Sequence, residues 1–364
     1  MPRLNVGVDI GSTSIKAVQI KISGKKVTVV KAAEIPLKVG VVVAGEIKDI
    51  EELSNAINEL WKVGKFTTKN VTVGLANQQI LVRELVLPWE PAKIFKDALP
   101  IRIGDAFSRS PSELILDYYP IDIYSSGDLI QQKSLVVGAY LQAAENAAEA
   151  LTLSKLRVKK ADFSPFALIR ASMVNNSKGI KLKPNTGKPY EVLIDVGGQI
   201  TLIAIHEQGK PLYVRIIPAG ADAVTRALSE QLKIRFDVAE VLKKSIGLQE
   251  VGGEQIKSPI PQDVPDESIP DAQHIINSMA GHLVQEVRKT IEYFLSLVQD
   301  SDGIERILLS GGGSLIPGYA QRIASELRIP TTFLAPMNTF AKNKDIKTKD
   351  PNMSLAFGLA LEVK

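Results

Sequence analysis

Val6 to Ile20 reads VGVDIGSTSIKAVQI, and this stretch decides how the fold is interpreted. An apolar run ends at Asp9, Gly11 begins a turn of small hydroxyl residues, and a second alternating run starts around Lys16. Glycine lets backbone N–H groups approach an anion closely, and hydroxyl and ammonium groups add further donors. The stretch is therefore typical of a loop that holds phosphate, although an ordinary hairpin turn between two strands has a similar composition.

The same pattern recurs in the second half of the chain. Glu191 to Ile205 reads EVLIDVGGQITLIAI, in which an apolar run ends at Asp195 and a glycine-rich turn follows. Further strand-like runs, 26–36 and 211–218, come after the two copies. A duplicated loop predicts two similar lobes that face each other across a cleft, which favours the phosphate interpretation. The two aspartates fit as holders of hydrated Mg²⁺, the alternative being residues that merely end a strand.

A third glycine cluster lies near the end of the chain. Arg306 to Leu327 reads RILLSGGGSLIPGYAQRIASEL, a buried strand that runs into glycines and then into a helix near Pro317. A glycine-rich junction between strand and helix lets a flat or anionic ligand lie against the backbone. Taken alone, this cluster is a weak signal.

Composition excludes several classes of protein. The 364 residues are too many for one small core and predict two or more lobes. A net charge of +4 is too small and too dispersed to indicate nucleic-acid binding, and the absence of cysteine excludes disulfides and thiolate metal sites. No apolar run reaches the roughly 18 residues of a spanning helix, and the strand pattern that begins at Leu4 leaves no room for a signal peptide. We therefore expect a cytoplasmic protein without direct membrane insertion.

In this order, the three clusters resemble the actin-like ATPase fold, a two-lobed α/β fold of the ribonuclease H-like type. The segment 80–107, ILVRELVLPWEPAKIFKDALPIRIGDAF, and the final segment 351–364, PNMSLAFGLALEVK, are similar to the PilM family of type IV pilus assembly proteins, which are relatives of the division protein FtsA. The resemblance covers nearly the whole chain. It implies a small α/β insertion in the first lobe, with ATP and Mg²⁺ as ligands.

The resemblance also implies a set of site residues. Those implied for ATP phosphate are Gly11, Ser12, Thr13, Lys16, Gly197, Gly198 and Thr201. Those implied for adenosine are Glu240, Lys243, Gly311, Gly312, Gly313 and Ser314, with Gly220 as a further contact, and those implied for the metal are Asp9 and Asp195. For Glu240 and Lys243 the alternative is a solvated helix face. Gln199 stands where many relatives have glycine, so its side chain is expected to narrow the loop.

One departure from the superfamily bears on catalysis. Many relatives carry Glu-Pro before the first connecting helix, and that glutamate orients the attacking water. Here the pair is Ser164-Pro165, with Asp162 two residues earlier. Serine cannot replace a carboxylate as a general base without its own activator. We therefore expect ATP binding with, at most, slow hydrolysis.

The organisation that we expect has three parts. The first lobe is expected to comprise 1–84, with 164–175 and 350–364 returning to it. The insertion is expected to comprise 85–163, and the second lobe 190–345. Helices are predicted over 50–63, 91–103, 142–154 and 271–298, and a hairpin turn over 125–128. The segment 175–189 is predicted as a polar link and 248–270 as a loop.

The family resemblance implies a partner for the insertion. That partner is the N-terminal cytoplasmic peptide of a PilN-like single-pass membrane protein, which would keep the chain at the inner face of the cytoplasmic membrane. We expect that pilus motor or platform proteins, or further copies of this chain, are additional partners. The candidate peptide contacts are Arg83, Leu87, Trp89, Ile94 and Arg102, together with Leu99 and Ile103 on the same helix. For each apolar residue the alternative is the core of the insertion.

Two other functions stay open at this stage. A small-molecule kinase of the same fold needs a catalytic aspartate beside its acceptor hydroxyl, and the middle segment offers none in a recognisable context. An FtsA-like division protein that forms filaments is expected to carry a membrane-binding amphipathic helix after the last helix of the fold, whereas this sequence ends at Lys364. We therefore expect an ATP-binding adaptor of a pilus or related type II secretion platform.

Overall fold

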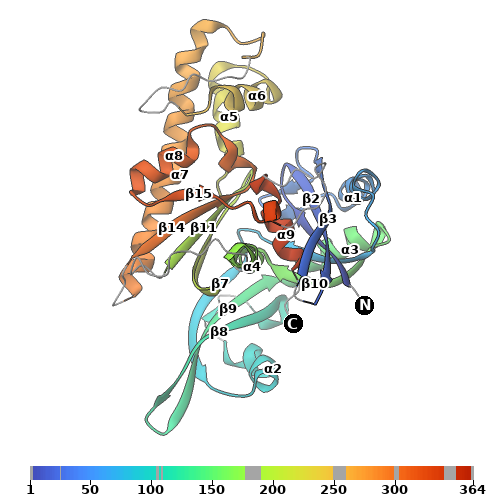
Figure 1. Cartoon of the computed structure of the whole chain (residues 1–364), viewed down its shortest axis with the longest axis vertical. Coiled ribbons are helices and arrows are strands. Elements are labelled where there is room, and N and C mark those ends of the chain that lie inside the picture. The colour runs from blue at the N-terminus through green and yellow to red at the C-terminus, as the bar shows by residue number, and fades with distance from the viewer. Residues whose placement is uncertain are drawn as a thin grey trace.

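The computed structural model describes residues 3–24, 26–103, 106–107, 110–176, 190–248, 260–298, 303–339 and 350–361. Its framework is a pair of five-stranded sheets, one in each lobe (Figure 1). The first sheet contains, in the order β10-β6-β1-β2-β3, Arg157–Phe163, Asn70–Leu75, Arg3–Ile10, Ser14–Ser23 and Lys26–Pro36. The second contains, in the order β13-β12-β11-β14-β15, Lys210–Ile217, Thr201–Glu207, Tyr190–Val196, Ile304–Ser310 and Thr331–Phe333.

The two sheets have the same topology, which confirms the duplicated pattern in the sequence. Each starts with an antiparallel meander and adds two parallel strands on the other side of its first strand. The registers also agree, because Asp9 pairs with Lys16 in one sheet and Asp195 pairs with Leu202 at the equivalent place in the other. The central strands of each sheet are buried on both faces, as in β11, where the adjacent residues Val192 and Leu193 belong to different cores.

Two helices lie between the sheets, α4 (Ser164–Asn176) and α9 (Ser354–Ala360) (Figure 1). They pack against each other, α9 against the first sheet and α4 against strands of both. Their apolar residues join side chains of both lobes in one core. Glycine permits this close packing, because a methyl group at Gly7 would lie 2.1 Å from the Ala356 carbonyl oxygen and one at Gly358 would lie 2.0 Å from that of Ala167.

The insertion has a separate three-stranded sheet, β7-β9-β8, formed by Leu81–Pro88, Leu129–Tyr140 and Leu114–Ser126. Helix α2 (Ala92–Arg102) packs on it over a small core of its own, and the β8–β9 hairpin extends away from both lobes (Figure 1). The predicted insertion, 85–163, includes two elements that lie outside this subdomain. Strand β10 pairs with β6 of the first lobe, and α3 (Leu141–Leu153) packs against α1 (Ile50–Gly64), so both belong to the first lobe by their contacts.

The remaining helices belong to the second lobe. They are α5 (Ala221–Leu232), α6 (Phe236–Ile246), α7 (Ile269–Leu297) and α8 (Tyr319–Leu327), with short 3₁₀ turns at Asp266–Ser268, Gly312–Leu315, Pro336–Thr339 and Pro351–Met353. Helices α5 and α6 pack against each other and against α7, and α8 packs against β15. The four predicted helices are present within two residues of their expected ends, and the predicted hairpin turn follows Ser126. Most of the predicted link, 177–189, and part of the predicted loop, 249–259, lie outside the described residues. Within the described ranges, no helix combines the length and apolarity that crossing a bilayer requires.

Candidate functional site

The two predicted phosphate loops share one local geometry and touch each other. The Gly11 N–H donates to the Ser14 carbonyl at 3.0 Å, and the Gly197 N–H donates to the Ile200 carbonyl at 2.9 Å. A methyl group at Gly198 would lie 2.6 Å from Thr13 Cγ2 of the other lobe. The loops therefore meet at one point between the lobes, and glycine is needed there for the close approach.

Three charged side chains gather beneath these loops. Lys16 Nζ lies 3.6 Å from an Asp9 carboxylate oxygen, and burial raises the pKa of Asp9. Burial, and next the negative charge of Asp9, raise the pKa of Asp195 to about 6, while a hydrogen bond with Ser310 and the charge of Lys16 oppose the rise. The two aspartates thus interact across the lobes as buried like charges, an arrangement that a bound cation would stabilise.

The residues present fit a magnesium ion of one particular kind. Among the described residues, no group of three or more His, Cys, Asp or Glu side chains is placed to hold a metal. Mg²⁺ commonly binds through one or two carboxylates, waters and substrate phosphate oxygens. Asp9 and Asp195 beside two glycine loops are a donor set of this type. The predicted metal role of both aspartates is compatible with the geometry and stays a prediction.

Two predicted phosphate residues differ in what their side chains do. Thr13 is exposed at the loop, whereas Thr201 is fully buried and its hydroxyl donates to the Ala219 carbonyl at 2.7 Å. Thr201 therefore holds the segment that leads into α5. A methyl group at Gly220 would lie 2.5 Å from both the Gly197 and Gly198 carbonyl oxygens, so this segment lies directly on the second loop.

The third glycine cluster lies beside the end of β11. Gly311 has φ +82, and a methyl group there would lie 2.4 Å from the Val196 carbonyl oxygen, so a side chain is excluded. Gly312 is exposed, while the Ser314 hydroxyl is buried and donates to the Gly311 carbonyl at 2.7 Å. The cluster therefore offers exposed backbone next to Asp195, as a nucleotide surface requires.

Glu240 and Lys243 form a network within the second lobe. Lys243 is 2% exposed, and its Nζ donates to Glu240 Oε2 at 2.6 Å, to Thr225 Oγ1 at 2.7 Å and to the Ala221 carbonyl at 3.2 Å. All three ammonium protons are thus used inside the protein, so Lys243 holds Glu240 in place. Glu240 itself is part-exposed, and a direct contact of either residue with adenosine stays a prediction.

Two further site residues escaped the sequence interpretation. The Ser310 hydroxyl donates to the Pro351 carbonyl at 3.0 Å and lies near enough to Asp195 to oppose the rise in its pKa, and the place of Ser310 immediately before the glycine cluster was an available signal. Glu34 lies 4.0 Å from Lys16 Nζ and accepts a hydrogen bond from Asn352 Nδ2 at 3.0 Å. No local pattern distinguishes Glu34 from any other polar strand residue, because its role depends on the pairing of β2 with β3.

The segment that replaces Glu-Pro offers no free general base. Ser164 is 1% exposed, and a methyl group at Gly74 would lie 2.7 Å from its hydroxyl oxygen. Asp162 is buried and forms an ion pair with Arg170. Both side chains are committed to packing between β10, β6 and α4, which supports the expectation of slow hydrolysis.

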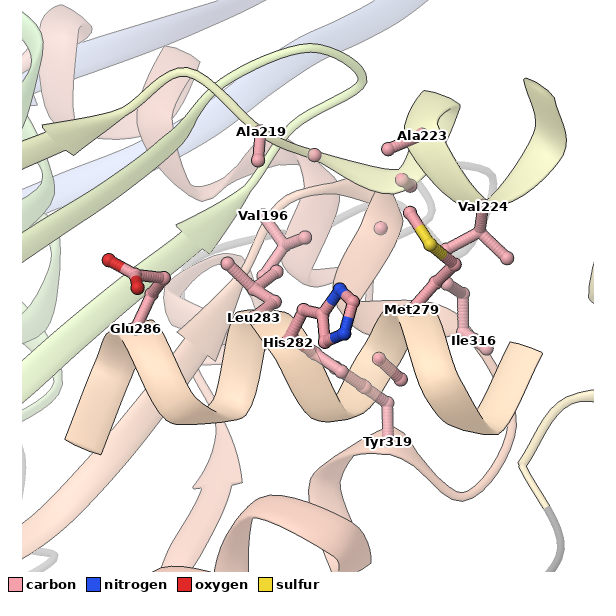
Figure 2. A pocket seen from close by; sticks show the side chains of 14 residues that line it. Val196, Ala219, Ala223, Val224, Met279, His282, Leu283, Glu286, Ile316 and Tyr319 are labelled. Atoms are coloured by element: carbon pink, nitrogen blue, oxygen red, sulfur yellow. The ribbon is translucent and has the colours of Figure 1, made fainter. Parts of the chain in front are cut away.

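A cavity of about 170 Å³ lies beside the third glycine cluster (Figure 2). Apolar side chains from α5, α7 and α8 line most of it, and Figure 2 shows Tyr319 extending from α8 towards α7. The Tyr319 hydroxyl is buried and lacks a hydrogen-bond partner among the described residues. Its lining includes Gly220 and Gly313, two of the residues predicted for adenosine, so the cavity borders the predicted adenosine surface.

The candidate peptide contacts on the insertion fall into two groups. Leu99 and Ile103 are each 1% exposed in the core of the insertion, so the prediction that they line a groove is wrong; they lie on the face of α2 that packs on the sheet. Leu87 also packs partly against that core. Trp89 and Ile94 are 42% and 54% exposed and remain accessible.

The two candidate arginines, Arg83 and Arg102, also differ in how accessible their side chains are. Arg83 is exposed, with one N–H donating to the Val82 carbonyl. Arg102 forms an ion pair with Glu90 at 2.6 Å, which positions it at the end of α2. Arg83 is therefore the more accessible of the two charges.

Comparisons with known proteins identify the family and the fold. The family model described as type IV pilus assembly protein PilM matches residues 7–364. The chain belongs to the PilM family of type IV pilus assembly proteins. A solved structure named the PilM-PilN type IV pilus biogenesis complex superposes with a TM-score of 0.80 at 23% identity, covering 98% of this chain and 97% of that one.

More distant relatives have the same fold. The ethanolamine utilization protein EutJ from Carboxydothermus hydrogenoformans superposes with a TM-score of 0.57 at 16% identity, covering 99% of this chain and 90% of that one. The cell division protein FtsA of Neisseria meningitidis serogroup B is 22% identical over 381 residues, which cover 97% of this chain and 88% of that protein. The actin-like fold expected of a PilM-family chain is thus confirmed, and FtsA is a distant relative.

Proposed function

We propose that this PilM-family chain is an ATP-binding adaptor of a type IV pilus, or related type II secretion, assembly platform. One observation carries the nucleotide part of the proposal: the duplicated loops bring Asp9, Lys16 and Asp195 together between the lobes. A buried cluster with two negative charges and one positive charge, flanked by glycine turns, suits a magnesium–nucleotide complex.

The residues divide the work of binding. The backbone N–H groups near Gly11, Gly197 and Gly198, with the hydroxyls of Ser12 and Thr13, bind the phosphates. Lys16 would neutralise phosphate charge, and Asp9 and Asp195 would hold Mg²⁺. The glycine cluster 311–313 and Glu240 would bind the adenosine. Bound Mg²⁺ would supply charge neutralisation of the phosphates, and buried Ser164 leaves water activation weak.

A stability measurement tests nucleotide binding. Mg-ATP at about 100 times its Kd stabilises a folded protein by about 2.7 kcal/mol, and we expect Asp195→Ala to lose most of this gain. Exposed Asp97 on α2 gives the control, since Asp97→Ala is expected to keep the full gain. An unchanged unfolding midpoint of the parent protein in saturating Mg-ATP contradicts the proposal.

The proposed partner is the N-terminal cytoplasmic peptide of a PilN-like inner-membrane protein. The similarity to a structure named the PilM-PilN complex supports this choice. Such a partner would hold the chain at the inner face of the cytoplasmic membrane. Strand β7 is the suggested docking edge, because it has a strand neighbour on one side only among the described strands and carries exposed Arg83. Extended peptides commonly add to such an edge and place alternate side chains in pockets.

Peptide titration tests the docking surface. Deleting the predicted insertion, 85–163, is a poor test, because it removes the whole of β10 from the first sheet. Point variants avoid this problem: Trp89→Ala and Ile94→Ala are expected to weaken binding of a labelled peptide severalfold. Val63, 56% exposed on α1, provides the control for Ile94, at 54%. Equal affinity of the parent, Val63→Ala, Trp89→Ala and Ile94→Ala contradicts the assignment of this surface.

A further inference from the structure

A short hairpin of the first lobe contains a strained turn. Strands β4 (Val42–Val43) and β5 (Glu46–Ile47) are joined by Ala44 and Gly45, which have φ +48 and +81. Two central residues with positive φ are the pattern of a type I′ hairpin turn. Alanine adopts the left-handed region only at a cost, and such strain persists where the surroundings fix the backbone. The contacts around this turn therefore hold Ala44 in its strained conformation.

The hairpin is fixed to the first lobe on two sides. The Leu37 N–H, at the start of the segment that leads into it, donates to the Thr13 carbonyl of the first phosphate loop at 2.9 Å. A methyl group at Gly45 would lie 1.9 Å from the Ala76 carbonyl oxygen, so the turn packs directly against the segment that follows β6. The hairpin thus moves with the first phosphate loop.

Gln199 of the second phosphate loop connects this turn to the other lobe. The Ala44 N–H donates to Gln199 Oε1 at 2.8 Å. The Gln199 side chain also lies near Asp222 in the first turn of α5, where it opposes the rise in the Asp222 pKa that burial causes. The bond from Ala44 fixes the orientation of the amide, because its oxygen accepts from the Ala44 N–H and its NH₂ group is left for the Asp222 carboxylate.

We propose that Gln199 is a latch that closes the phosphate end of the cleft and slows nucleotide release. This inference rests on the proposed ATP binding. Gly198, beside the latch, touches Thr13 of the other lobe, so any separation of the two phosphate loops breaks both this contact and the bond from Ala44 to Gln199. A smaller residue at this position provides no such bridge. The latch retains nucleotide and contributes nothing to hydrolysis.

Release of a fluorescent ATP analogue measures the effect. The parent protein is loaded with mant-ATP and Mg²⁺, and dissociation is followed after addition of excess unlabelled ATP. One neutral hydrogen bond corresponds to roughly a 2- to 13-fold change, so Gln199→Ala is expected to release the analogue faster by that factor. The control is Gln142→Ala, which removes an exposed glutamine bonded to Asn146 on α3. Equal release rates for the Gln199→Ala and Gln142→Ala proteins overturn the latch.

Amide hydrogen exchange tests the latch without nucleotide. In the nucleotide-free parent protein, the Ala44 N–H is expected to exchange slowly, and in Gln199→Ala it is expected to exchange several times faster. Unchanged exchange at Ala44 overturns the latch whether or not the analogue binds. Failure of the parent to bind mant-ATP, with faster exchange in the variant, instead contradicts the proposed function and leaves the contact between the lobes established.

Discussion

Replacing Lys243 with methionine is expected to destabilise the protein far more than the same change at Lys244. Both lysines lie on α6, and both pair with Glu240, at 2.6 Å and 3.0 Å. Their surroundings differ, because the side chain of Lys243 is 2% exposed and that of Lys244 is 66% exposed. The two variants therefore compare a buried ion pair with an exposed ion pair, both formed with the Glu240 carboxylate.

The magnitude follows from the partners that each change leaves behind. Lys243→Met keeps the aliphatic stem and leaves the Ala221 carbonyl, the Thr225 hydroxyl and part of Glu240 without their buried donor. Removing one partner of a buried pair costs about 3–5 kcal/mol. An exposed pair contributes about 0–1 kcal/mol, so we expect the two variants to differ by about 3 kcal/mol.

Urea unfolding followed by far-UV circular dichroism measures the difference. Both tryptophans, Trp61 and Trp89, lie outside the second lobe, so their fluorescence is the poorer probe. A double-mutant cycle with Glu240→Gln is expected to give a large coupling to Lys243 and a small one to Lys244. Losses that agree within about 0.5 kcal/mol refute the assignment of Lys243 as the buried support of Glu240.

The other predictions concern acid sensitivity, packing and catalysis. Burial lowers the pKa of His206 to about 4, so the unfolded chain binds an extra proton at this residue between pH 6.5 and 4, and the contribution of His206 to stability falls by about 3 kcal/mol over that window. Because the raised pKa of Asp195 acts in the opposite direction in every variant, urea unfolding at each pH is expected to show this loss as a difference: the parent and His274→Asn, a change at an exposed histidine, lose about this much relative to His206→Asn. Tyr319→Phe removes a buried hydroxyl without a partner and is expected to raise the melting temperature, whereas Tyr118→Phe removes a bonded hydroxyl and does not. Parent ATP turnover is expected to stay below about 1 s⁻¹, and Ser164→Glu, which places a charge in a buried site, is expected to lower stability without raising turnover in a phosphate-release assay.

Short-range features were predictable from the sequence. The loops after Asp9 and Asp195 were found because a strand, a glycine turn and a second strand lie within one continuous stretch, and their hydrogen bonds close over three residues. Helix α7 was found for the same reason, since its apolar residues repeat at the helical period along one segment. Duplication of the loop then implied the pairing of the lobes, which the matching strand orders confirm.

Contacts between distant residues were decided only by the tertiary structure. The pattern of α2 marks Leu99 and Ile94 equally as apolar, yet one is core and the other is exposed, because the sheet beneath the helix determines which face is buried. The assignment of β10 to the first sheet depends on its pairing with β6, many residues earlier. The contact of Ala44 with Gln199 spans 155 positions and depends on how the two lobes close. The spacing of apolar residues predicts the conformation of a single segment. Contacts such as these depend on how separate segments pack, which the sequence of either segment alone does not determine.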